Sequence, residues 1–298
     1  MRVTFNSTFL QSAADLARTA EEMAERQRQV SSGKRLHVPS DDPASASGSV
    51  RERTEQAALD QYTKTADTAT SRLMVVDSVL SSVLDRLTAA RTSLLSARGT
   101  VVTPAQREAA AQTLTGIRDA IYNGFNATFH GTYVFAGSAG TTPPYQQAAD
   151  GTVTANAIDD NPIAVDVGQE MTVQITYSAQ RIAQGTAAED LFATLERAIA
   201  AVRAGDDAEM GAAETALVQA FERVTAAQSH TGTSLNALEV QQARIRELRL
   251  AADARIAGFE NANMAEAITK MNQAETAYRA ALGAIGTNGQ VTLMDYLR

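Results

Sequence analysis

Apolar and small side chains recur every three or four positions along most of the chain. Over the first thirty residues, the recurring positions alternate between steps of three and four: Asn6, Phe9, Ala13, Leu16, Ala20, Met23, Gln27 and Val30. This spacing places them on one stripe of a helix and is typical of coiled-coil seams. The sequence Ser31-Ser32-Gly33 ends this helix, because glycine readily takes the positive φ that follows a helix.

A second and much longer helix is predicted to begin at Pro43. Asp42 is a suitable N-cap residue, and proline is favoured at the first helical position. The three-four spacing then continues without interruption through Leu59, Tyr62, Ala66, Ala69, Leu73, Val76, Leu80, Val83, Leu87, Ala90, Leu94 and Ala97. Gly99 is expected just beyond the end of this helix.

In the middle of the chain, the helical spacing gives way to a segment of different composition. Thr103-Pro104-Ala105-Gln106 has the pattern of a capping box and opens a third helix, with Leu114, Ile117, Ile121 and Phe125 on one face. Residues 132–185 are rich in threonine, glycine and proline, and we expect strands at 132–135, 163–167 and 171–177. A second capping box at 186–189 predicts a helix that ends at Gly205.

The last hundred residues return to helical spacing. A long helical stretch is predicted from about residue 207 to 283, and its final part carries the stripe Met264, Ile268, Met271, Glu275, Tyr278, Leu282 and Ile285. Asn288-Gly289 predicts a turn, and residues 291–297 are expected to form a short apolar tail.

These elements predict a mainly α fold, with a long antiparallel helical rod that both chain ends build and a small β-rich insert domain. The expected domains are 1–42 with 256–298 as a terminal helical core, 43–131 with 186–255 as a long-helix rod, and 132–185 as the insert. The terminal stripes allow two interpretations. They form an intramolecular two-helix core, or they form the inner layer of a tubular assembly in which neighbours complete the packing.

Composition limits the function classes. The chain has 57 alanines against 15 phenylalanines and tyrosines, so thin helical cores are expected. The absence of cysteine excludes disulfides and thiolate chemistry, and a net charge of −8 is unsuited to nucleic-acid binding. We find no apolar run long enough to span a membrane and no cleaved signal peptide, so neither membrane insertion nor signal-dependent secretion is expected.

No motif predicts a catalytic, cofactor-binding or metal site. The three histidines, His37, His130 and His230, lie far apart without the i,i+3 or i,i+4 partners of a metal site. Asp41-Asp42 could suggest acid–base chemistry, but the following proline favours helix capping. Lys34-Arg35 is expected to be solvated. The protein is therefore not expected to be an enzyme.

Two terminal motifs resemble the bacterial flagellin superfamily. The sequence from Val30 through Ser32, Gly33 and Arg35, followed by Asp41-Asp42-Pro43, resembles the signature after the first helix of that family. Residues 259–267, Phe-Glu-Asn-Ala-Asn-Met-Ala-Glu-Ala, are similar to the segment before its last helix, with Asn261 and Asn263 where acids are usual.

Shorter motifs resemble one branch of that superfamily, hook-associated protein 3, whose members form the hook–filament junction. The first contains Tyr133, Phe135 and Gly137, and is followed by Pro143-Pro144-Tyr145. The second is the ending, with Asp295, Tyr296 and Leu297, where flagellins usually carry a different tail.

The resemblance implies a structural subunit that is exported through the flagellar type III pathway, without a cleaved signal, and serves motility at the extracellular end of the hook. It implies as partners other copies in a ring, hook-associated protein 1, flagellin, and an export chaperone on the C-terminal helix. The expected assembly surface comprises Phe9, Leu16, Met23, Val30, Met264, Ile268, Met271, Tyr278, Leu282 and Ile285.

Two alternatives remain open from the sequence. One is flagellin itself, the filament subunit of the same superfamily. The other is a helical signalling coiled coil, which long antiparallel helices would fit but which would have a tight hairpin at its tip instead of a β-rich insert.

Overall fold

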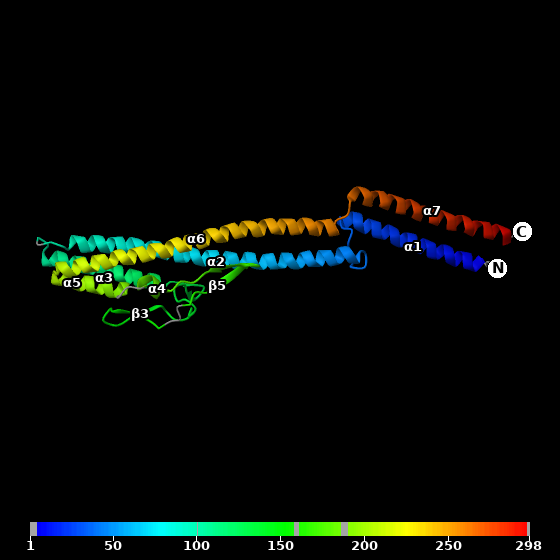
Figure 1. Ribbon diagram of the computed structural model, residues 1–298. Coiled ribbons are helices and arrows are strands. Elements are labelled where there is room, and N and C mark those ends of the chain that lie inside the picture. Colours follow the sequence, from blue (N-terminus) through cyan, green and yellow to red (C-terminus); the bar gives the residue numbers. More distant parts are fainter. Residues whose placement is uncertain (1–4, 100, 158–160, 186–189, 297–298) are drawn as a thin grey trace. The chain divides into compact units, whose positions relative to one another are not determined.

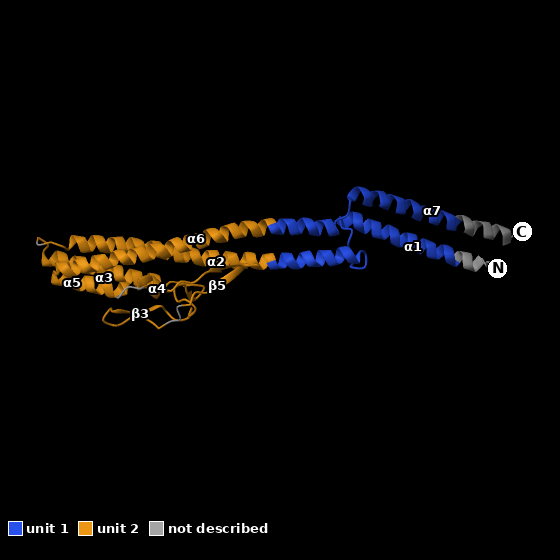
Figure 2. Cartoon of the chain, in the orientation of Figure 1, with its two compact units in different colours: residues 1–58, 248–298 blue, residues 59–247 orange. Residues whose placement is uncertain are grey.

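The computed structural model describes residues 5–99, 101–157, 161–185 and 190–296, with side chains between 10 and 286. This part of the chain forms two compact units, residues 1–58 with 248–298 and residues 59–247 (Figure 2). The predicted mainly α class is confirmed. The helices are α1 (Phe5–Ser32), α2 (Pro43–Ser96), α3 (Pro104–Phe125), α4 (Ala179–Ala183), α5 (Leu191–Ala204), α6 (Asp207–Glu260) and α7 (Met264–Tyr296). None of the described helices is long and apolar enough to cross a membrane.

The first unit joins the two chain ends. Helix α1 packs along α7, and the two run in opposite directions (Figure 1). In the same unit the beginning of α2 lies beside the end of α6. There the Arg255 Nε donates to Glu52 Oε2 at 2.7 Å, and the Gln56 amide donates to Asp253 Oδ1 at 2.7 Å. Residues more than 190 positions apart therefore form one helical unit.

The second unit has the larger core. The predicted stripe of α2 is confirmed from Leu59 to Ala97, with every position buried except the half-buried Tyr62. The predicted face of α3 is also buried, and so are Leu195, Ile199 and Val202 of α5. On α6 the buried residues include Met210, Leu217, Val224 and Leu238. Each of these helices has a narrow apolar stripe, so the core forms only where several stripes meet.

Four aromatic side chains close the core beside the C-terminus of α3. The Phe125 ring lies 5.5 Å from the Phe135 ring and 6.2 Å from the Phe192 ring, both edge to face. Tyr145 completes the cluster, and its hydroxyl donates to Asp190 Oδ2 at 2.7 Å. Burial, with the nearby Asp190 carboxylate, raises the pKa of Tyr145 far above its usual range.

Over its described residues, the β-rich segment contains three antiparallel hairpins, each with two strands. They pair β1 (Thr128–Phe129) with β2 (Thr132–Tyr133), β3 (Tyr145–Gln147) with β4 (Val153–Ala155), and β5 (Ala164–Gly168) with β6 (Met171–Gln174). The expected strands at 132–135, 163–167 and 171–177 correspond to β2, β5 and β6, shorter or shifted by a residue. The sequence pattern missed β1, β3, β4 and the short helix α4.

Several helix ends agree with the capping residues in the sequence. Thr103 and Gln106 form the predicted capping box, and Gly205 ends α5 at φ +75°. The second predicted capping box, 186–189, lies outside the described residues, and α5 begins after an N-cap at Asp190.

Two predictions about the C-terminal region are wrong. The stretch from 207 to 283 is broken after Glu260, since Asn263 caps a separate helix through its Oδ1 and the Ala265 amide at 3.2 Å. The turn predicted at 288–289, with its short tail, is also absent, because α7 remains helical to Tyr296. A glycine inside a helix costs only about 1 kcal/mol, so an Asn-Gly pair without flanking strands does not enforce a turn.

The β-rich segment belongs to the same compact unit as α3 and α5. The compact unit of the chain ends spans residues 1–58 and 248–298, and the expected terminal domain, 1–42 with 256–298, lies within it. The division into a separate rod and insert stays a prediction.

Neighbouring leucines at the end of α2 test the assignment of the core. Leu94 is fully buried, whereas Leu95 is 48% exposed. We expect Leu94→Ala to lower the free energy of unfolding by about 2–5 kcal/mol, because truncation removes buried methyl groups and leaves a cavity. Leu95→Ala is the matched control and should change it by less than about 0.5 kcal/mol. Urea denaturation followed by circular dichroism measures both, and equal losses would contradict this core.

Candidate functional site

Both helix breaks of the first unit meet at one place. The loop between α1 and α2 contacts the break between α6 and α7 through its backbone. The Ala262 N–H donates to the Gly33 carbonyl at 2.9 Å, and the Arg35 N–H donates to the Glu260 carbonyl at 2.7 Å. Gly33 has φ +70°, which L-residues with side chains rarely adopt. The motif residue Gly33 therefore lets the chain leave α1 and pair with the distant break.

The carboxylate of Glu260 is the centre of this contact. Its side chain is only 8% exposed. One oxygen accepts from Ser49 Oγ at 2.5 Å and from Arg53 Nη2 at 2.7 Å, and the other accepts from Lys34 Nζ at 3.1 Å. These donors hold the pKa of Glu260 down at about 2, Ser49 having the largest effect. We call Glu260 with Lys34, Ser49 and Arg53 the Glu260 network.

Arg35 binds the other side of the same break. Its guanidinium donates to Asp42 Oδ2 at 2.9 Å, to Ser45 Oγ at 3.0 Å and to the Phe259 carbonyl at 3.0 Å. Lys34 and Arg35 are exposed as expected, but both also bind partners in the break, which the sequence did not predict. Their partners on α6 are more than 220 positions away, and no local pattern reveals such pairs.

Asp42 has the helix-capping role that the sequence favoured, whereas Asp41 orders the loop before it. Asp42 caps α2, since its Oδ1 accepts from the Ser45 N–H at 3.1 Å directly before Pro43. Asp41 Oδ2 accepts from the N–H groups of His37 and Val38, each at 2.9 Å. The pKa of Asp42 is lowered mainly by the Ser45 hydroxyl and then by Arg35, and that of Asp41 by the two backbone N–H groups. Both carboxylates are therefore occupied.

A close contact completes the region. A Cβ at Gly48 would lie 2.8 Å from the Phe259 ring, closer than side chains approach one another. Glycine at this position of α2 thus lets Phe259 pack against the helix backbone.

The seam between α1 and α7 is thin. Among the described side chains of the two helices, only Ala267 and Ala274 are buried, at 5% and 7% exposed. The larger residues of the predicted surface that lie half-buried are Leu16, Met23, Val30, Met271, Tyr278 and Ile285. The side chain of Phe9 is outside the described set. The seam on α7 thus follows two alanines that the sequence stripe omitted in favour of larger neighbours.

The other predicted residues of α7 are exposed. Met264, Ile268 and Leu282 are 41%, 43% and 46% exposed, although all three are large and apolar. They follow one another at helical spacing beside the seam. We call these three residues the apolar flank.

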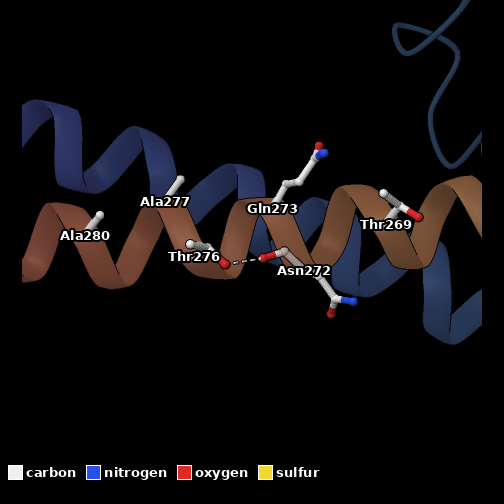
Figure 3. Close-up of a pocket in the computed structure, with 6 residues that line it drawn as sticks. All are labelled: Thr269, Asn272, Gln273, Thr276, Ala277 and Ala280. Carbon is white, nitrogen blue, oxygen red and sulfur yellow. Dashed lines mark hydrogen bonds between the residues drawn. The ribbon is translucent and has the colours of Figure 1, made fainter.

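A third face of α7 is uncharged and has small side chains. It borders a shallow groove of about 550 Å³, lined by Thr269, Asn272, Gln273, Thr276, Ala277 and Ala280 (Figure 3). The sticks in Figure 3 show short side chains along the helix, and the Thr276 hydroxyl donates to the Asn272 carbonyl at 2.8 Å. The apolar stripe in the sequence did not identify this face. The feature that could have indicated it is the lack of charged residues among these positions.

The remaining motif residues lie elsewhere. Phe135 is buried in the aromatic cluster, Tyr133 accepts from Arg72 Nη2 through its carbonyl at 3.0 Å, and Gly137 takes φ +57°. These three residues anchor the β-rich segment of the second unit. The backbones of Asp295 and Tyr296 are part of helix α7, and their side chains are outside the described set. Leu297 lies outside the described residues altogether.

Groups suited to metal chemistry are dispersed. Over the described residues, no three histidine or acidic side chains form a group that could hold a metal ion. His230 instead contacts the Tyr177 hydroxyl through Nδ1 at 3.0 Å. The arrangement in the first unit is suited to holding helices together and to packing further helices.

The amino-acid sequence is similar to that of known flagellar proteins. Residues 3–140 match the bacterial flagellin N-terminal helical region. Flagellar hook-associated protein 3 of Escherichia coli is 30% identical over 261 residues, which cover 80% of this chain and 81% of that protein. The protein of the same name from Salmonella typhimurium is 29% identical over 257 residues, with 80% and 81% covered.

Solved structures share the fold. A flagellar hook-associated protein from Vibrio parahaemolyticus has a TM-score of 0.70 at 22% identity, covering 74% of this chain and 100% of that one. FlgL from Xanthomonas campestris has a TM-score of 0.62 at 15% identity, covering 69% and 99%.

The Glu260 network makes stability depend on pH. Because the pKa of Glu260 is lowered from 4.5 to about 2, its contribution is complete above about pH 4.5 and is lost as the pH falls towards 2. We expect Glu260→Gln to destabilise the first unit by about 1–3 kcal/mol at pH 7. The difference from the natural protein should shrink at pH 3. Amide hydrogen exchange at Arg35, whose N–H bonds to Glu260, reports the loss.

Glu266→Gln is the matched control for this change. Glu266 is an exposed glutamate that pairs with Lys270 within α7. Surface pairs of this kind contribute little, so exchange at Arg35 should stay as in the natural protein. Equal effects of the two variants, or an effect of Glu260→Gln that is the same at pH 3 and pH 7, would contradict the network.

Proposed function

The chain belongs to the flagellar hook-associated protein 3 family, and from this membership we propose that it is a structural subunit of the bacterial flagellum at the hook–filament junction. The family assignment favours this function over a signalling coiled coil. Flagellin, the filament subunit, would have to be far more abundant in the flagellum than a junction subunit, so the copy number per flagellum separates those two.

The apolar flank is the observation that carries the proposal. Burying one large apolar side chain contributes about 1.5–3 kcal/mol, and three such residues at helical spacing are an unused source of binding energy. The seam beside them buries only two alanines among its described side chains. A pair of helices with so thin a seam is stabilised when further helices pack against it.

The uncharged face of α7 supports the same interpretation. Small side chains allow the backbones of two helices to approach closely, and the distance between helix axes depends on the residues at the contact. The groove beside Thr269, Asn272, Thr276 and Ala280 contains no charged lining residue that would have to be desolvated or paired. Helix α7 can therefore contact α1 on one face and neighbours on two others.

We propose that these neighbours are further copies in a ring, with hook-associated protein 1 on the hook side and flagellin on the filament side. Before assembly, an export chaperone would cover the C-terminal helix and its apolar flank. The subunit would leave the cell through the flagellar type III pathway, guided by its N-terminal segment and without a cleaved signal. It would act outside the cell, as a structural component rather than as an enzyme.

Ile268→Asp separates assembly from folding. Because Ile268 is exposed in the single subunit, the change should alter the free energy of unfolding by less than about 0.5 kcal/mol. In an assembly the new carboxylate would be buried without a partner, at a cost of several kcal/mol. We expect normal export, subunits released into the medium and filaments that are not anchored to hooks. The measurement compares the subunit in the medium with the subunit on purified hooks.

Glu266→Gln again serves as the control and should assemble normally. If Ile268→Asp is incorporated at the natural level, the apolar flank is not an assembly surface. If Ile268→Asp unfolds the free subunit, the residue belongs to the intramolecular core instead.

A further inference from the structure

A groove of about 370 Å³, lined by both polar and apolar side chains, lies in the second unit, far from α7 in sequence. Side chains of α2 between residues 61 and 72 form one wall, the β1–β2 hairpin forms another, and Val165 and Ile175 of the β5–β6 region complete it. All of these residues belong to the same compact unit. Neither the terminal motifs nor the proposed assembly surface includes this groove.

The wall from α2 contains a buried cation. Arg72 is 9% exposed, and its guanidinium donates to the Ile175 carbonyl, to Thr132 Oγ1 and to the Tyr133 carbonyl at 3.0–3.1 Å. All three acceptors are neutral. Burial lowers the pKa of Arg72, and among the described residues no carboxylate counters that effect. A guanidinium has five N–H groups, so these three bonds leave donors unused.

The hairpin adds an aromatic surface and a second basic side chain. His130 is an exposed residue with φ +49°, and the following Gly131 has φ +79°, so both occupy the left-handed region in a two-residue turn. The imidazole stacks on the ring of Phe129, with centroids 4.1 Å apart. This turn places a flat ring pair at the mouth of the groove.

Two acidic residues beside the groove, Asp67 and Asp166, are directed elsewhere. Asp67 of α2 accepts from the Gln242 amide at 2.9 Å. On β5, Val165 lines the groove, whereas Asp166 is the next residue and points to the opposite face of the hairpin. The described lining thus includes Lys64, Arg72 and His130 but no acid, in a chain whose net charge is −8.

We propose that this groove binds an organic carboxylate. Lys64 and the unused donors of Arg72 would bind the carboxylate oxygens, while Val165, Ile175 and the Phe129–His130 pair would contact the apolar part of the ligand. A buried cation without a counter-ion is costly, and a bound carboxylate would offset that cost. The ligand is either a free aromatic acid or the side chain of an acidic peptide. This inference does not depend on the flagellar function.

Titration of the full-length ¹⁵N-labelled protein tests the proposal. The probes are benzoate, N-acetyl-glutamate N-methylamide and the matching N-acetyl-glutamine N-methylamide, at constant ionic strength. We expect the amide signals of His130 and Gly131 to shift with at least one carboxylate, at an affinity at least tenfold above that for the glutamine probe. Tighter binding of benzoate would assign the groove to free aromatic acids, and tighter binding of the glutamate probe to peptide side chains.

Two variants test the residues without disturbing the buried guanidinium. Lys64→Gln should weaken carboxylate binding at least threefold. His130→Asn should weaken it as well, and it keeps a residue that tolerates positive φ. Lys270→Gln, on the exposed surface of α7, is the matched control and should bind as the natural protein does. Arg72 remains unchanged, because its loss would also release the hairpin backbone.

Three results would overturn the proposal. The first is that neither benzoate nor the glutamate probe binds more tightly than the glutamine probe. The second is unchanged carboxylate binding after Lys64→Gln. The third is inorganic phosphate binding as tightly as both carboxylates, which would make the groove a general anion site rather than one for organic carboxylates.

Discussion

The thin seam between the two chain ends is the constraint on which the rest of the structure depends. Helices α1 and α7 are rich in alanine and small polar residues, and the described side chains that they bury are two alanines. In the second unit, by contrast, α2 alone buries Leu73, Leu80 and Leu87 against neighbouring helices. Because the energy of burial follows the apolar area, the terminal pair has much less to offset its loss of conformational entropy.

Polar contacts fix how the two chain ends align with each other, which the thin seam between α1 and α7 does not. The buried carboxylate of Glu260 is held by donors from the loop after α1 and from α2, and Arg35 links that loop to the end of α6. Such contacts are directional, and a buried carboxylate without its donors is strongly unfavourable. The chain ends therefore meet in one arrangement, which leaves the same three apolar side chains of α7 available outside the pair.

Periodicity in the sequence predicts the helices and the core of the second unit well. The stripe of α2 was identified correctly because leucine and valine mark it continuously, with no competing apolar face. On α7 the same reasoning selected Ile268 and Leu282, although Ala267 and Ala274 occupy the seam. A prediction from apolar spacing favours large apolar residues for the contact surface. Where two helices pack closely, small residues such as alanine occupy that surface instead.

Long-range contacts could not be predicted. The donors to Glu260 lie more than 200 positions away. Strands β1, β3 and β4 were missed because strands of two or three residues are too short to show alternation. The capping of α2 by Asp42 was predictable, since capping is a local interaction.

Labelling of a single cysteine in α7 tests the central claim most directly, because the natural chain contains no cysteine. Leu282→Cys places a thiol on the apolar flank, and Ala267→Cys places one in the buried seam. We predict that maleimide labels Cys at position 282 rapidly in the free subunit and at least tenfold more slowly in purified hook–filament junctions, whereas position 267 is protected in both. Equal labelling of position 282 in the free and assembled states would contradict the account.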